Sequence, residues 1–236
     1  MAYEWIFYNR EIFKLVYTVL IGLICFIIVL KTDRLFRLSF HQGIRYFRDA
    51  FFFYGLAFIT RYFLGTAYFF ADRTVLHASI IKIVFEFFII MAGFFLLYSL
   101  LWKKFETEKG SFSSLFNLRI ILFYALTFVI VFLDYLWNTY CFMFVSQIIL
   151  FIYASIISYA NYKINKEKQS FLKMYFLVII LNLIAWLSNL AIATIFNWSQ
   201  IGVINIYILN LIIFLMFLYS IINATKKSLA RNLKRF

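Results

Sequence analysis

Proline is absent from this 236-residue sequence, and cysteine, histidine and glycine are scarce, at two, two and seven residues. Cys25 and Cys141 supply neither a disulfide framework nor the paired spacing of a metal site. His41 and His77 lie too far apart in the chain to form a haem or zinc constellation. No glycine-rich phosphate loop, nucleophile elbow or HExxH motif occurs either. We therefore expect no catalytic residues, no metal, no cofactor and no enzymatic activity.

Charge is also scarce, at 14 % of residues, whereas 65 % of the residues are hydrophobic and 33 are phenylalanine. This composition lies far outside the range of soluble globular proteins. The apolar residues form blocks of about 20, the length of a membrane-spanning helix, and do not alternate with polar residues as barrel strands do. The sequence predicts an all-α, polytopic membrane helical bundle.

Seven apolar blocks predict seven transmembrane helices. They are expected near Ile12–Leu30, Phe47–Phe69, Leu76–Trp102, Leu115–Tyr135, Tyr140–Ala160, Phe171–Phe196 and Ile201–Ile222. The transmembrane domain then covers 1–223, and 224–236 form a basic cytoplasmic tail. Without proline the helices should be mostly straight, with Gly22, Gly55 and Gly93 as weak points. Straight helices disfavour a transporter built from broken helices.

The basic residues are divided unequally between the two sides of the membrane. Of the 23 lysines and arginines, eighteen fall on the side of the C-terminus and five on the other. The positive-inside rule then places the N-terminus outside and the C-terminus in the cytoplasm. A net charge of +13 would suggest nucleic acid for a soluble protein, but these charges lie between spans. We expect a multi-pass protein of the cell membrane whose partner is the lipid bilayer, and no nucleic acid. The connections at 137–139 and 197–200 are short and predict tight helical hairpins.

The third span, Leu76–Trp102, carries Lys82 and Glu86 four residues apart on one helical face. Charges inside a span are costly and mark functional sites or buried pairs. Arg61, Lys82, Glu86 and Asp134 all fall at a similar depth in the outer part of the membrane. Arg61–Glu86 and Lys82–Asp134 are the expected pairs, and Lys82–Glu86 competes with them. A structural ion-pair cluster and a ligand or ion site both remain open.

Polar residues of the later spans reach the same layer of the bundle. They are Gln147, Asn182, Trp186, Asn189 and Asn205. Together with the four charges they could line an outward-facing pocket. Hydrogen bonding between helices is the alternative role for such amides.

Five basic residues between the first two spans, Arg34, Arg37, His41, Arg45 and Arg48, recur at spacings of three and four residues. This spacing places them on one face of an amphipathic segment at the inner interface. Such a face is expected to bind anionic lipid at the cytoplasmic side. Docking of an acidic cytoplasmic protein partner is the alternative.

The stretch FRDAFFFYGLAFITRYF at Phe47–Phe63, within a seven-span layout with the N-terminus outside, resembles small archaeal membrane proteins related to the seven-helix input modules of prokaryotic sensors. The resemblance implies a sensor fold, carries over no functional residue, and leaves signal output to a separate membrane or cytoplasmic partner. The sequence thus predicts a non-enzymatic receptor or sensor. The alternatives are a small transporter or channel that uses Glu86 as a proton or cation site, and a structural subunit of a membrane complex.

Overall fold

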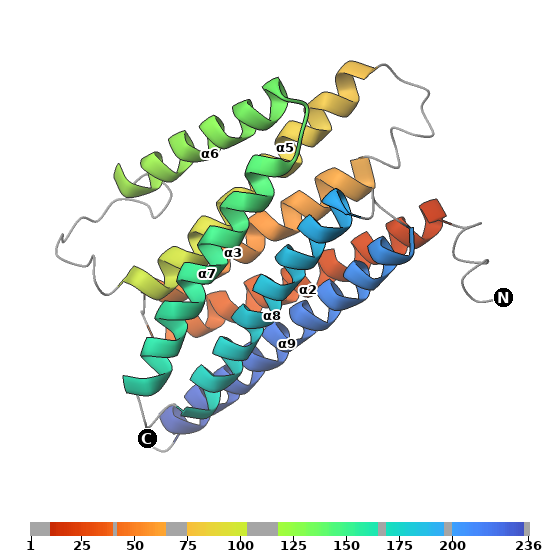
Figure 1. The fold of residues 1–236 in the computed structure, drawn as a ribbon. Coiled ribbons are helices and arrows are strands. Elements are labelled where there is room, and N and C mark those ends of the chain that lie inside the picture. The colour runs from red at the N-terminus through yellow and green to blue at the C-terminus, as the bar shows by residue number, and fades with distance from the viewer. Residues whose placement is uncertain are drawn as a thin grey trace.

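The computed structural model describes residues 10–39, 42–64, 75–102, 118–164, 169–195 and 200–233, and the regular secondary structure in these ranges is helical. Figure 1 shows the helices, most of them running along one common direction. They are α2 (Arg10–Ser39), α3 (Gln42–Phe58), the π-helix η1 (Ile59–Leu64), α5 (Val75–Leu101), α6 (Leu118–Leu136), α7 (Cys141–Ile164), α8 (Gln169–Thr194) and α9 (Gln200–Leu233). Six of the expected apolar blocks each overlap one of these helices, and the second overlaps α3 and η1, with its residues 65–69 outside the described ranges.

Six of the described helices are long and apolar enough to cross a membrane, namely α2 and α5 to α9. Length and composition therefore fit a multi-pass membrane bundle. The exception is α3, which has 17 residues and carries Arg45, Arg48 and Asp49 in its first half. The chain continues from it directly into the six residues of η1. The expected straight second span is thus an α-helix followed by a π-helix, although no proline or glycine interrupts it at that point.

Six helices form a closed ring in which neighbours pack in the order α2, α3, α5, α7, α8 and α9, and α9 returns to α2. The remaining helix, α6, packs outside this ring against α5 and α7, as Figure 1 shows. Aromatic side chains fill the interior of the ring. Phe51 of α3 lies 5.8 Å from Phe214 and 5.0 Å from Phe217 of α9, measured between ring centroids. Phe217 in turn lies 6.1 Å from Tyr175 of α8, so the phenylalanines hold opposite sides of the ring together.

At Gly43, the backbone of α3 lies very close to the end of α5. A Cβ atom at this position would lie 2.5 Å from Cδ1 and Nε1 of the Trp102 indole and 2.9 Å from the carbonyl oxygen of Ser99. No side chain larger than hydrogen fits there unless the two helices move apart.

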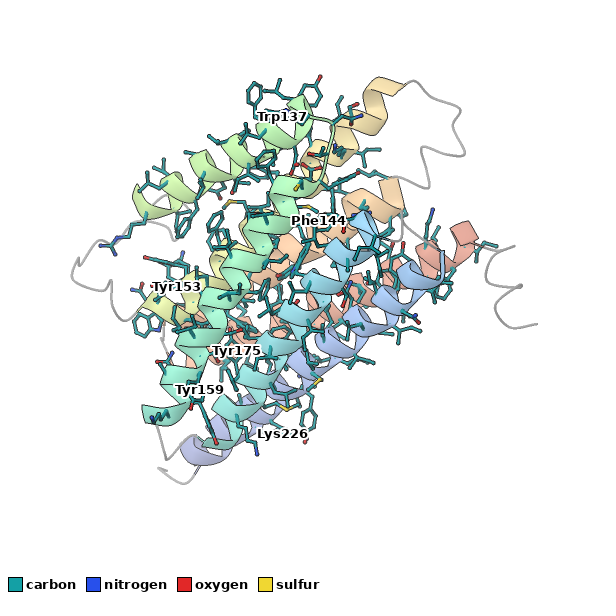
Figure 2. All side chains as sticks on the ribbon, viewed as in Figure 1. Trp137, Phe144, Tyr153, Tyr159, Tyr175 and Lys226 are labelled. Carbon is teal, nitrogen blue, oxygen red and sulfur yellow. The ribbon has the colours of Figure 1, made fainter. Side chains whose placement is uncertain are left out.

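The two ends of the bundle differ in chemistry. We call one the Glu86 end, where Tyr17 of α2, Tyr62 of η1 and Tyr207 of α9 pack together. Trp137 lies at this end and Lys226 toward the other, which we call the Arg48 end (Figure 2). Residues 224–233 of the expected basic tail continue α9 as a helix.

Candidate functional site

Glu86 is a buried carboxylate in the first half of α5. Its exposed fraction is 1 %, and neither Oε1 nor Oε2 has a hydrogen-bond partner among the residues that the structure describes. Lys82 Nζ lies 3.9 Å from Oε1, within ion-pair range but beyond hydrogen-bonding distance. Burying a carboxylate without hydrogen bonds carries a large free-energy cost. Glu86 therefore has the character expected of a functional acid in a membrane bundle.

Of the three pairings considered for this layer, the structure forms Lys82–Glu86, within α5. In the described part of the chain, Arg61 makes no ion pair with Glu86 and lies instead against the ring of the adjacent Phe85. Lys82 and Asp134 form no ion pair there either. Asp134 is instead engaged by the helix that follows it.

Asp134, at the end of α6, is fully buried and caps the start of α7. Its Oδ1 accepts hydrogen bonds from Thr139 Oγ1 at 2.9 Å and from the backbone N–H of Phe142 at 3.1 Å. Its Oδ2 accepts a third, at 2.7 Å, from the N–H of Met143. A carboxylate at this position satisfies amides that the helix itself leaves unpaired and interacts favourably with the helix dipole. The role of Asp134 is to hold the α6–α7 hairpin.

Lys82 lies between Glu86 and the α6–α7 turn. Its Nζ is 3.5 Å from Oδ1 of Asn138 and 4.4 Å from the centroid of the Tyr140 ring. The Lys82 side chain keeps 14 % of its surface exposed. Asn138 adopts a left-handed conformation, with φ of 48°, which asparagine tolerates better than most residues. The turn between α6 and α7 thus places the side-chain oxygen of Asn138 near Lys82.

Arg61 lies in η1, and π-helical turns are frequent at functional sites. Its Cζ is 4.5 Å from the ring centroid of Phe85, 5.6 Å from that of Tyr62 and 6.0 Å from that of Tyr140. These are cation–π distances. Among the residues that the structure describes, no carbonyl or carboxylate accepts a hydrogen bond from this guanidinium. Three aromatic faces therefore surround a cation whose donors have no acceptor among the described residues.

We refer to Arg61, Lys82, Glu86, Asp134 and Tyr140 as the Glu86 cluster. It joins η1, α5, α6 and the start of α7 at one end of the bundle.

Gln147 is buried but does not belong to this cluster. Its Nε2 donates a hydrogen bond to the carbonyl oxygen of Ile89 at 3.3 Å, joining α7 to α5. Its Oε1 would lie 2.7 Å from a Cβ atom at Gly93, seven residues beyond Glu86 along α5. Seven residues are about two helical turns, or about 10 Å. The Gln147 side-chain amide thus links α7 to α5 at a position deeper in the bundle than Glu86.

The polar residues expected from the last two helices are spread over different environments. Trp186 of α8 packs against Phe144 of α7, with ring centroids 6.1 Å apart. Figure 2 shows Phe144 in the upper half of α7, toward the Glu86 end. The side-chain amide of Asn189 donates to a carbonyl of its own helix at 3.0 Å. Asn182 is buried on α8, and Asn205 is exposed on α9.

The expected basic face is divided between two helices. Arg34 and Arg37 lie on the last turns of α2, and Arg45 and Arg48 lie on α3. His41 falls outside the described residues. The structure therefore differs from the single amphipathic segment that the spacing predicts, because α2 extends nine residues beyond Leu30 as a helix.

Acidic residues at the Arg48 end pair with two arginines of this basic face. Arg48 donates from Nη1 to Asp33 of α2 at 2.6 Å and from Nη2 to the adjacent Asp49 at 3.0 Å. Arg37 also bonds to Asp33, at 3.0 Å, and its side chain remains 80 % exposed. Arg48 thus ties α2 to α3, whereas Arg37 keeps most of its surface exposed.

Sequence reasoning missed Tyr140, Asn138 and Asp33 as partners of these charges. The spacing of Asp33 and Arg37, four residues apart on a helix, was a usable signal. No sequence pattern marks Tyr140, because its role depends on Arg61 and Lys82 arriving from two other helical segments.

No protein-family model, no curated protein and no solved structure matches this chain.

Proposed function

We propose that this protein is a non-enzymatic receptor or sensor of the cell membrane, whose responsive element is the Glu86 cluster. The proposal includes seven spans, the second formed by α3 together with η1, since their 17 and 6 residues suffice for one crossing. The unequal distribution of lysine and arginine supports an N-terminus outside and a cytoplasmic C-terminus. The Glu86 cluster then faces the outside.

The observation that carries this proposal is a buried acid without hydrogen bonds beside two cations. Glu86 has Lys82 at 3.9 Å, and the Arg61 guanidinium nearby makes no ion pair with it. A second arrangement, in which Glu86 pairs with Arg61, would move η1 relative to α5. A ligand that prefers one arrangement shifts the population between the two, which is the physical requirement for sensing.

A nitroxide spin label on Cys141 tests the responsive element. Cys141 is exposed at the start of α7, beside Tyr140, whereas Cys25 is buried. We expect Glu86→Gln to change the mobility of this label and to lower the melting temperature, because it removes the charge that attracts Lys82. Glu167→Gln, outside the apolar spans, is the control and should change neither quantity. Identical spectra and melting curves for wild type and Glu86→Gln would contradict the proposal.

One observation favours a second candidate, a small transporter or channel. The hydroxyl groups of Tyr54 and Ser220 are buried in the bundle without a hydrogen-bond partner among the described residues. Such groups often bind internal water. The rings of Phe51 and Phe214, however, pack beside Tyr54 in the interior of the ring, which argues against a continuous polar path.

Proteoliposomes containing a trapped pH dye separate the two candidates. The receptor proposal predicts no proton or cation flux above that of empty liposomes. A flux that Glu86→Gln abolishes would establish the transporter instead.

The Arg48 end would contact the cytoplasmic leaflet. Exposed Arg34 and Arg37 there can bind anionic lipid, each contributing about 1 kcal/mol near a charged surface. A cytoplasmic or membrane protein partner that reads the signal would bind at the same end.

A further inference from the structure

The Glu86 cluster contains a mismatch between acceptors and donors. Both carboxylate oxygens of Glu86 are buried without a donor. The guanidinium of Arg61 has no acceptor among the described residues. Arg61 lies 4.5 Å from the ring of Phe85, the chain neighbour of Glu86, and shares the Tyr140 ring with Lys82, but it forms no ion pair with Glu86. A ligand that accepts a hydrogen bond from Arg61 and donates one to Glu86 would satisfy both side chains.

The other members of the cluster are already engaged and cannot resolve this mismatch. All the hydrogen bonds of Asp134 serve the α6–α7 hairpin. The Lys82 ammonium contacts the Asn138 side chain and the face of the Tyr140 ring. It lies 3.9 Å from the Glu86 carboxylate, too far for a hydrogen bond.

We propose that Glu86 and Arg61 together bind one small zwitterion, whose ammonium group donates to the Glu86 carboxylate and whose oxyanion accepts from the Arg61 guanidinium. This inference rests on the proposed function and names the ligand class of the same cluster. The Tyr140 and Phe85 rings, which lie against Arg61, keep its guanidinium in place for a bidentate contact.

The charges of the cluster discriminate against ligands with a single charge. A simple cation beside Glu86 is repelled by Arg61 and Lys82. A simple anion beside Arg61 is repelled by Glu86 and Asp134. A molecule with both charges places each one beside its opposite, and no net charge is brought into the bundle. The partly exposed Lys82 side chain and the exposed Asn138 put one side of the cluster at the surface, and a ligand would approach Glu86 from that side.

Two sources can supply this chemistry, a free amino acid and the ethanolamine phosphate headgroup of a membrane lipid. Both carry a primary ammonium a few bonds from an oxyanion. The test therefore needs soluble probes and lipid probes.

For the soluble probes, the full chain is placed in phosphatidylglycerol nanodiscs and titrated by calorimetry with glycine and with glycerophosphoethanolamine, whose single phosphodiester charge matches that of the lipid headgroup. Acetate and methylammonium are the single-charge controls. We expect saturable binding of at least one zwitterion and none of either control. Glu86→Gln and Arg61→Gln should each weaken binding about tenfold or more, because each removes a charged hydrogen-bond partner. Lys163→Gln, an exposed change on the last turn of α7, should leave binding unchanged.

For the lipid probes, the melting temperature is compared in phosphatidylethanolamine and phosphatidylglycerol nanodiscs. A lipid ligand predicts a higher melting temperature in phosphatidylethanolamine for wild type, and no difference between the two lipids for Glu86→Gln.

Equal responses to zwitterions and single-charge controls, together with equal melting in the two lipids, would overturn the inference. These comparisons use the wild-type protein, so they hold even if a variant fails to fold. If no zwitterion binds while Glu86→Gln still alters the Cys141 label, the ligand class is wrong and the responsive cluster stands.

Discussion

At the scale of single residues, the two buried carboxylates Asp134 and Glu86 lie on adjacent helices and differ in their hydrogen bonding. Asp134 accepts three hydrogen bonds, two of them from backbone amides of α7. Glu86 accepts none. The first is therefore a structural acid, whereas the second has the Lys82 ammonium beside it at 3.9 Å without a hydrogen bond. The difference arises from the α6–α7 turn, which brings free amide groups to one carboxylate and not to the other.

Asp134→Ala should destabilise the protein, because it leaves two backbone amides, one of them buried, and the Thr139 hydroxyl without an acceptor. Loss of a helix cap costs about 0.5–2 kcal/mol, and the buried position places the expected effect at the upper end. Thermal unfolding in detergent measures it as a lower melting temperature. Thr139→Val removes one of the three bonds and should cost less. Equal effects of the two variants would show that the backbone contacts of Asp134 contribute nothing.

At the scale of elements, the contact between α3 and α5 depends on a residue without a side chain. The Trp102 indole and the Ser99 carbonyl occupy the space that a Cβ atom at Gly43 would need. The π-helix η1 at the other end of α3 places Arg61 against the aromatic rings of the Glu86 cluster. The α3–η1 segment is thus fixed at both ends by its packing on α5.

Gly43→Ala should destabilise the bundle by about 1–3 kcal/mol, the usual cost of overpacking, since the backbone carbonyl of Ser99 cannot turn aside. Gly22→Ala is the matched control, because nothing lies within 4 Å of a Cβ atom at that position. Alanine is also the better helix former, by about 1 kcal/mol, so this control should be neutral or stabilising. Denaturation midpoints of the two variants provide the comparison. A stable Gly43→Ala protein would mean that α3 and α5 are not held this closely.

At the scale of the whole molecule, a ring of six helices with α6 outside brings one charged cluster to each end. The Glu86 end has two cations and two acids, whereas Arg34 and Arg37 add exposed positive charge at the Arg48 end. This asymmetry agrees with the orientation proposed from the distribution of lysine and arginine.

Native Cys141 makes the orientation testable in cells. It is exposed at the Glu86 end, so a membrane-impermeant maleimide added to intact cells should label it. The variant Cys141→Ser retains only the buried Cys25 and should not react. In that background, Lys226→Cys at the Arg48 end should react only after the membrane is permeabilised. The reverse pattern would invert the proposed topology.

The sequence by itself determined the positions of the helices and the presence of charges among apolar residues. A helix in a membrane satisfies its own backbone hydrogen bonds, so the local run of apolar residues is enough to place it. The ranges predicted around Glu86 and around Cys141 therefore agree with α5 and α7 to within a few residues.

Only the tertiary structure decided which charges meet. Lys82–Glu86 formed within one helix, and Asp134 capped α7 instead of pairing with Lys82. Arg48 of α3 formed an ion pair with Asp33 of α2. The expected basic face is divided between these two helices. Such choices depend on how each helix is rotated against its neighbours and on which backbone amides a turn leaves unpaired. Neither is encoded in a local pattern of residues.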